Sequence, residues 1–79
     1  MPTPTGEPPS AVFDDARGGG RALRVTWHPD AQLLVLSVWR DGVCIASHRM
    51  TADELPRLAH LVTDTMAIAY AEAPATAPA

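Results

Sequence analysis

The sequence contains no lysine, no asparagine and a single cysteine, Cys44. One cysteine cannot form a disulfide within a chain, so a small fold stapled by disulfides is excluded. No apolar run approaches the ~18 residues that a membrane-spanning helix requires. The first nine residues also lack the basic stretch followed by an apolar one that marks a secretory signal. We therefore expect a cytoplasmic protein with no membrane partner.

The sequence has few charged residues, and acidic residues slightly outnumber basic ones. Six arginines stand against nine acidic residues, which gives a formal net charge of −3. Proteins that coat nucleic acid need a positive balance to displace counterions, so wholesale coating is not expected. Fourteen alanines and eight prolines, together with the missing lysine and asparagine, indicate GC-rich codons. The use of arginine instead of lysine therefore carries little functional meaning here.

The 79 residues leave room for one domain. Prolines and glycines concentrate in residues 1–20, including the run 18–20, and predict a disordered tail. Residues 11–13 leave an alternative open, because they could add an edge strand or dock on the body. An Ala/Pro-rich stretch, residues 72–79, is predicted to be a second tail. The folded domain is expected to span residues 21–71.

Three segments show strand patterns. Leu23, Val25 and Trp27 alternate with polar neighbours, as in a half-buried strand. Residues 33–40 are apolar on both sides, which is typical of a strand covered on both faces. The dipeptide Asp41-Gly42 then predicts a two-residue type I′ turn, so residues 43–50 return as a third strand. The predicted fold is α+β: a three-stranded antiparallel meander followed by one C-terminal helix, packed as a homodimer.

The two-residue turn fixes a predicted register. Trp39 faces Cys44, and pairing then continues with Val38 opposite Ile45. Further along, Leu36 faces Ser47 and Val35 faces His48. Under this register both faces of the sheet are apolar. One face carries Leu34, Leu36, Val38 and Ile45 with Arg40 and Arg49 at its ends, and the other carries Leu33, Val35, Trp39, Cys44, Ala46 and Met50.

A helix is predicted over residues 53–70. Two caps are open: Thr51, which has capping-box spacing to Glu54, and Asp53, which is preferred because it places Pro56 in the first turn. At 100° per residue the apolar side chains cover roughly 200° of the helix, whereas an ordinary surface helix has a stripe of ~100° or more. They are Leu55, Leu58, Ala59, Leu61, Val62, Met66, Ile68, Ala69 and Tyr70.

The excess apolar surface predicts self-association. A body of about 50 residues lies near the lower limit for independent folding. One helix cannot cover both faces of the sheet, so a twofold homodimer is expected and a heterologous partner is the alternative. Which sheet face is used stays open. The predicted interface residues are Leu33, Val35, Trp39, Leu61, Met66 and Ile68.

No pattern predicts catalysis. Cys44 and His48 are both zinc-ligand types, but four residues along a strand separate them by ~13 Å, too far for one metal. The run of glycines 18–20 precedes a strand, whereas a phosphate loop opens a helix. No two carboxylates are placed in one pocket by sequence. We expect no enzyme, no cofactor and no metal.

A contact surface is predicted at Arg24, Trp27, Arg40 and Arg49. Arginines interleaved with aromatic residues on a sheet bind single-stranded nucleic acid by neutralising phosphates and stacking bases. The preferred interpretation of both tryptophans is that they anchor the core or the dimer interface. Nucleic acid is accordingly the less favoured partner, behind a second copy of the chain and a regulatory protein.

Two resemblances follow from these residues. The pattern Arg24-x-x-Trp27, Val35-Leu-Ser-Val-Trp39-Arg40, Cys44, His48-Arg49 is similar to small proteins common in actinobacteria, which implies no activity and no site residues. The strand–strand–strand–helix order resembles positive cofactor 4 (Whirly) and PUR-type modules in topology only, which implies dimers that bind single-stranded nucleic acid. The first hypothesis is a non-catalytic homodimeric regulatory protein that acts by protein–protein contacts. The alternative is a single-stranded nucleic-acid-binding transcriptional regulator of the positive cofactor 4-like type.

Overall fold

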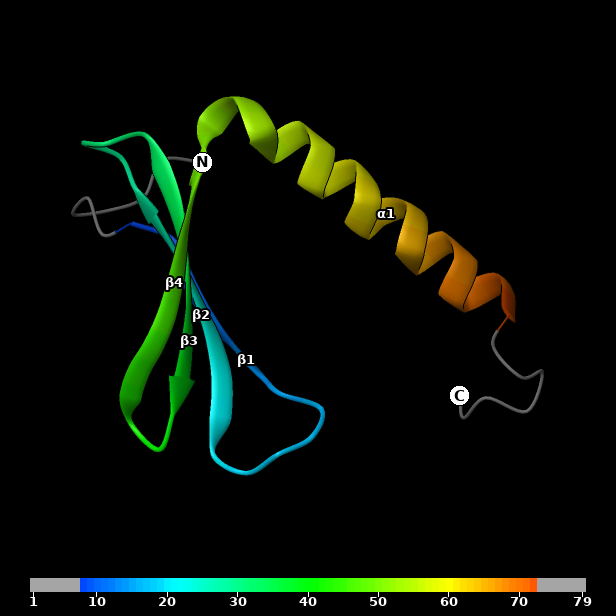
Figure 1. The fold of residues 1–79 in the computed structure, drawn as a ribbon. Helices are drawn as coiled ribbons and strands as arrows, with labels where there is room; N and C mark the ends of the chain where they lie inside the picture. Colours follow the sequence, from blue (N-terminus) through cyan, green and yellow to red (C-terminus); the bar gives the residue numbers. More distant parts are fainter. Residues whose placement is uncertain (1–7, 73–79) are drawn as a thin grey trace.

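The computed structural model describes residues 8–72, which form an antiparallel sheet followed by a helix (Figure 1). The elements are β1 (Ser10–Asp14), β2 (Arg21–His28), β3 (Leu33–Arg40), β4 (Val43–Thr51), the 3-10 helix η2 (Ala52–Glu54) and α1 (Leu55–Glu72). The strands lie in the order β1-β2-β3-β4, and each is antiparallel to its neighbours. The predicted α+β class and the C-terminal helix are confirmed, whereas the predicted number of three strands is wrong.

The additional strand is β1, which lies inside the range predicted as a disordered tail. It pairs with β2 from Ser10 opposite Thr26 to Asp14 opposite Ala22. The hydroxyls of Ser10 and Thr26 are 3.0 Å apart. The edge strand that residues 11–13 left open as an alternative is therefore the one observed, and this five-residue segment gains its order from its backbone and side-chain partners in β2. Residues 15–20 of the same predicted tail form the loop that joins β1 to β2, and Glu72 is the last residue of α1. Residues 1–7 and 73–79 of the predicted tails lie outside the described residues.

The turn between β3 and β4 is the one that the sequence predicts. Asp41 and Gly42 have φ values of 51° and 82°, and a type I′ turn requires positive φ at both central residues. Arg40 pairs with Val43 across the turn. The next pair, Trp39 with Cys44, is also the predicted one.

Beyond that pair a β-bulge changes the register. Trp39 pairs with Cys44, but Val38 pairs with Ala46, so Ile45 is left out of the pairing. Because side chains alternate between faces, one extra residue moves every later side chain of β4 to the opposite face. The predicted partners of Val38, Leu36 and Val35 are therefore wrong. Leu36 pairs with His48, and Val35 pairs with Arg49.

The corrected register separates an apolar face from a polar face. Residues directly opposite each other on neighbouring strands share a face. The apolar face carries Ala11, Phe13, Leu23, Val25, Trp27, Leu34, Leu36, Val38, Ala46, His48 and Met50. The polar face carries Ser10, Val12, Asp14, Ala22, Arg24, Thr26, His28, Leu33, Val35, Ser37, Trp39, Cys44, Ser47, Arg49 and Thr51. The prediction that both faces are apolar is wrong, since Ser47, Arg49 and Thr51 of β4 fall on one side.

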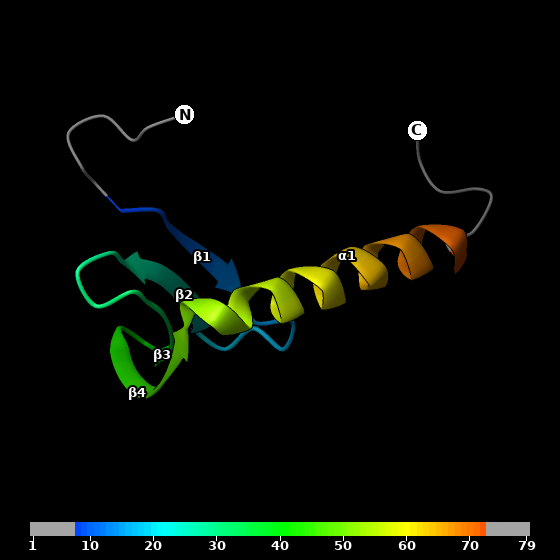
Figure 2. The same cartoon turned by 90° about the horizontal axis from the view of Figure 1, so that it is seen from above.

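The helix begins after a single 3-10 turn. Thr51 precedes η2 with no side-chain cap hydrogen bond, and Asp53 lies within η2, so neither predicted cap is used. Pro56 is the second residue of α1, where its missing N–H costs no helical hydrogen bond. From there α1 projects away from the sheet, as both views show (Figures 1 and 2). None of its residues is buried, and only Leu55 and Leu58 are half-buried.

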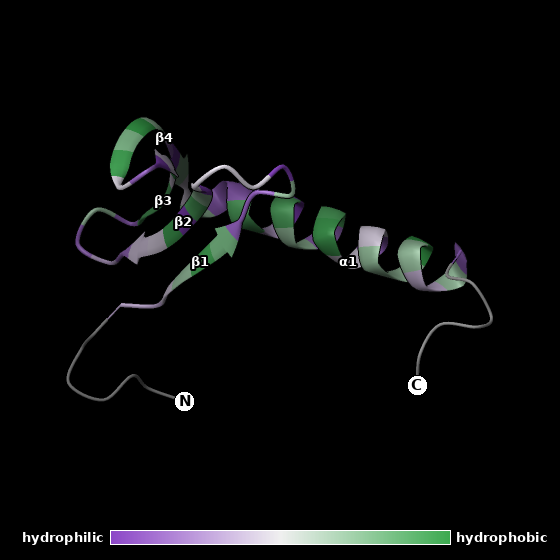
Figure 3. Ribbon diagram, turned by 90° about the horizontal axis from the view of Figure 1, so that it is seen from below, coloured by the Kyte–Doolittle hydropathy of each residue, from purple (hydrophilic) through white to green (hydrophobic). Residues whose placement is uncertain are grey.

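The described residues contain no buried hydrophobic side chain. Ser37, at 8% exposure, is the one buried residue between 8 and 72. Hydrophobic bands mark both the strands and α1 (Figure 3), and large side chains such as Phe13 (54%) and Met66 (52%) are exposed. The sheet is thus a single layer whose apolar face has no second layer from the same chain.

Gly20 lies where the β1–β2 loop meets the β3–β4 turn, because the backbone N–H of Asp41 donates to the Gly20 carbonyl over 2.9 Å. Gly18 and Gly20 both have left-handed φ values, 73° and 71°. A Cβ at Gly20 would collide with the Asp41 carboxylate, whereas one at Gly18 would meet nothing within 4 Å.

We predict that Gly20→Ala lowers the free energy of unfolding by about 2 kcal/mol and Gly18→Ala by about 1 kcal/mol. Both variants place Ala in the left-handed region, and only the first also displaces a carboxylate. Urea unfolding at one protein concentration measures both. Equal losses would show that the collision contributes nothing.

Candidate functional site

The polar face brings Arg24 and Trp39 into direct contact. The guanidinium carbon of Arg24 lies 4.7 Å from the centroid of the Trp39 ring. A cation over an indole face is attracted by the ring quadrupole, and the contact also covers part of the ring. Arg49 lies on the same face, because Arg24 and Arg49 pair with Ser37 and Val35, two positions apart on β3. Two arginines and one tryptophan therefore share one surface.

Ser37 holds this arrangement in place. The indole Nε1–H of Trp39 donates to the Ser37 hydroxyl oxygen over 2.9 Å. That hydroxyl in turn donates to the backbone carbonyl of Arg24 over 3.4 Å. Buried polar groups need partners, and each of these groups satisfies another. Ser37 was not among the predicted site residues, although it is the only polar residue among the apolar residues of β3 before Arg40.

The predicted contact set does not form one surface. Arg24 and Arg49 lie on the polar face, whereas Trp27 pairs with Leu34 on the apolar face. Arg40 pairs with Arg21 at the end of the sheet, in line with the apolar face. The bulge accounts for Arg49, which the predicted register placed on the other face together with Leu34 and Leu36.

A shallow hollow of about 470 Å³ lies at one end of the polar face. Arg49 and His28 flank it, and Leu33, Val35 and Ala31 supply apolar walls. The two ion pairs among residues 8–72, Arg17–Asp15 and Arg57–Glu54, involve neither flanking residue. The hollow thus combines an arginine without an ion-pair partner among the described residues with an aliphatic floor.

The predicted interface residues fall into two separate groups. Leu33, Val35 and Trp39 lie half-buried on the polar face. Leu61, Met66 and Ile68 lie on α1 with exposures of 63%, 52% and 57%. The single chain does not bring the groups together, and their role in a dimer stays a prediction.

Cys44 and His48 lie on opposite faces of the sheet. Cys44 is exposed beside Trp39 on the polar face, and its thiol is 3.6 Å from the Ala46 carbonyl. His48 lies opposite Leu36 on the apolar face. No three His, Cys, Asp or Glu side chains in the described part of the chain are grouped to hold a metal ion.

Within the same residues, no helix has the length and apolar character to cross a membrane.

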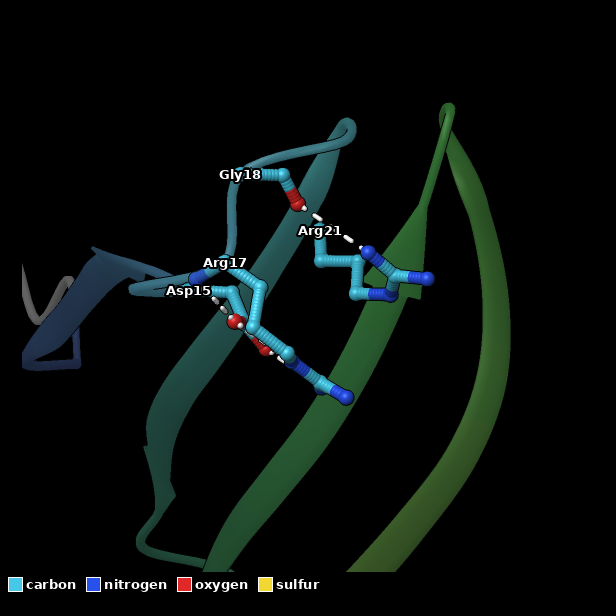
Figure 4. Close-up of polar contacts among 4 residues, drawn as sticks. All are labelled: Asp15, Arg17, Gly18 and Arg21. Carbon is cyan, nitrogen blue, oxygen red and sulfur yellow. Dashed lines mark hydrogen bonds and ion pairs between the residues drawn. The ribbon is translucent and has the colours of Figure 1, made fainter.

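The loop between β1 and β2 contains a self-contained ion pair (Figure 4). Arg17 donates to Asp15 from Nη2 over 2.8 Å, from Nε over 3.0 Å and from its backbone N–H over 2.8 Å. These side-chain and backbone hydrogen bonds hold the pKa of Asp15 well below its usual range and raise the pKa of Arg17. Arg21 donates to the Gly18 carbonyl over 3.3 Å. The loop charges neutralise each other, so we assign them a structural role.

We predict that Arg17→Ala raises the pKa of Asp15 toward its ordinary value of 3.8. The return is partial because the backbone N–H of residue 17 still donates. Since the folded pKa is lowered, the contribution of the pair to stability is complete above the ordinary pKa and is lost as the pH falls through the folded one. NMR titration of the Asp15 carboxyl carbon in both proteins measures this. An unchanged midpoint would show that the guanidinium does not set the pKa.

Comparisons with known proteins identify no relative of this chain. No family model, no curated protein and no solved structure matches the chain. The resemblances drawn from residue pattern and strand order therefore stay predictions.

Proposed function

We propose that the protein is a non-catalytic homodimer that acts in regulation through contacts with other macromolecules. The observation that carries this proposal is the absence of any buried hydrophobic side chain among residues 8–72. Burial of apolar surface is the dominant favourable term in folding, and a single uncovered layer lacks it. A second copy of the chain supplies the missing layer, and twofold symmetry closes the assembly.

In this proposal the sheet contributes its apolar face to the dimer. That face carries ten apolar residues and His48, with Arg21 and Arg40 only at its end, whereas the polar face carries Arg24 and Arg49 among its strands. Burying an arginine without a partner costs several kcal/mol, so the polar face is the poorer interface. The proposal therefore moves the interface away from Leu33, Val35 and Trp39 and keeps the predicted helix residues. The polar face remains in solvent, where it can meet a regulatory protein.

We predict that light scattering on a size-exclusion column gives a mass of about twice the 8.4 kDa monomer. Leu36→Asp places a charge at the centre of the apolar face and abolishes the dimer. Ser47→Asp introduces the same side chain on the polar face of β4 and leaves the dimer intact. A monomeric, folded wild-type protein, or equal loss of dimer in both variants, would refute the proposed interface.

One observation favours a second candidate function, binding of single-stranded nucleic acid. Arg24, Trp39 and Arg49 share the polar face with a set of hydroxyl side chains. Asp14, at one end, is the only acidic side chain that the described strand pairing places there. Arginines neutralise phosphates, hydroxyls donate to them, and an indole stacks on bases. These features support the alternative drawn from the sequence, although the net charge of −3 works against it.

We predict for this candidate that a fluorescent 20-mer of deoxythymidine binds at low salt and is released as salt rises. Arg24→Ala and Arg49→Ala should each weaken binding and reduce the slope of log K against log salt by about 0.7, the value for one phosphate contact on a single strand. Arg57→Ala, which removes an arginine of α1 that is paired with Glu54 of η2, is the matched control. If the wild-type protein shows no binding at low salt, this candidate is eliminated and a protein partner remains.

A further inference from the structure

We propose that α1 of each copy lies across the apolar face of the other copy, so that the two chains exchange helices. The inference rests on the proposed homodimer and names what covers each apolar face. It assigns to α1 the role of the second layer that the sheet lacks within its own chain.

The helix surface matches this role. Leu55, Leu58, Val62 and Met66 follow one another at intervals of three and four residues and form one line along α1. Leu61 and Ile68 widen the apolar arc on one flank. An arc of roughly 200° exceeds what packing on one sheet needs, since a surface helix uses ~100° or more. The wider arc suits a helix that contacts both a sheet and the neighbouring helix of a twofold pair.

The direction of α1 also fits an exchange. Its first turns lean on the apolar side of the sheet, because Met50 of that face lines one shallow hollow together with Leu58 and Leu61. Beyond this hollow α1 runs outward (Figures 1 and 2), and its residues 59–72 are exposed. A helix that leaves from the apolar side of its own sheet extends toward a second copy that packs on that side. In a twofold pair, the apolar arc of α1 then meets the apolar face of the other sheet.

The dimensions of the two surfaces agree. Eighteen helical residues extend about 27 Å. Eight-residue strands are also about 27 Å long, and four strands are about 15–20 Å wide. One helix therefore crosses the whole apolar face, along the strands or diagonally.

Pairing of sheet edges is the less suitable way to assemble. The edge strand β1 has five residues and follows Pro8 and Pro9, and proline cannot donate to a neighbouring strand. The other edge, β4, carries the bulge at Ile45, which interrupts a regular ladder of backbone groups. Edge pairing would also leave the apolar face in water. Face packing by α1 covers that face and leaves both edges as they are.

Chemical cross-linking between two differently labelled chains tests the exchange. Both chains carry Cys44→Ser, which removes the native thiol. One chain adds Met66→Cys at the middle of α1, and an isotope-labelled chain adds Leu36→Cys at the centre of the apolar face. After the two are unfolded and refolded together, a short bis-maleimide should join labelled to unlabelled chain. Two control pairs are matched to it. In the first, Ala67→Cys on the polar side of α1 replaces Met66→Cys, and in the second, Ser47→Cys on the polar face replaces Leu36→Cys.

The exchange predicts a cross-linked heterodimer at least tenfold more abundant for the Met66→Cys and Leu36→Cys pair than for either control pair. A chain that carries both cysteines gives a second measurement, because it should cross-link to a second copy and not within itself. Dimers by light scattering that give no excess cross-link, or only cross-links within one chain, would overturn the exchange and leave the homodimer standing. A monomer by light scattering would overturn both.

Discussion

An apolar sheet face stabilises a protein only when it is removed from water, and this requirement governs everything else in the molecule. Apolar burial contributes about 25 cal/mol per Å², so a face of ten apolar residues represents a large part of any folding free energy that the chain can gain. No described element of the chain covers that face. Folding and assembly are therefore one equilibrium in our proposal, and the stability of the fold rises with protein concentration.

The bulge at Ile45 sorts the side chains of β4 between the two faces. With it, Met50 lies beside Leu34 on the apolar face, and Arg49 lies beside Val35 on the polar face. Without the extra residue the two would change places, and an arginine would lie within the apolar surface. A single irregularity thus keeps Arg49 off the apolar face and places it on the face that carries Arg24. Bulges that are retained for such a reason act as designed features of a sheet.

The features that depend on neighbours in sequence were predictable. The Asp41-Gly42 turn requires positive φ at two adjacent residues, and the dipeptide itself signals it. The wide apolar arc of α1 also follows from spacing alone, and it predicts a helix with more apolar surface than one sheet face can cover. The predicted helix start lies two residues early, because the first turn adopts 3-10 geometry at Ala52–Glu54.

The features that depend on distant partners were predictable in part or not at all. Residues 11–13 suggested an edge strand only as an alternative to a disordered tail, because the short segment is ordered by pairing with β2. The bulge has no residue code, yet it decides which face receives Arg49 and so which candidate residues lie together. Ser37 is important because it contacts the Trp39 indole and the Arg24 carbonyl. Trp39 lies two residues further along β3, and Arg24 lies opposite Ser37 on β2. The sequence alone indicates which residues are candidates for the site. It does not indicate which of them share a face, because that depends on how the strands pair.

The polar face is preorganised in a way that an ordinary solvent-facing surface is not. The Trp39 ring is tied at its N–H by Ser37 and covered by the Arg24 guanidinium, so its orientation is set before any partner arrives. Rigid aromatic groups bind at a lower entropic cost than flexible ones, and they are enriched where binding energy concentrates. In a twofold dimer this surface occurs twice, on opposite outer sides of a shared apolar centre. A partner with two matching segments then binds the second one at high effective concentration, which a monomeric sheet cannot provide.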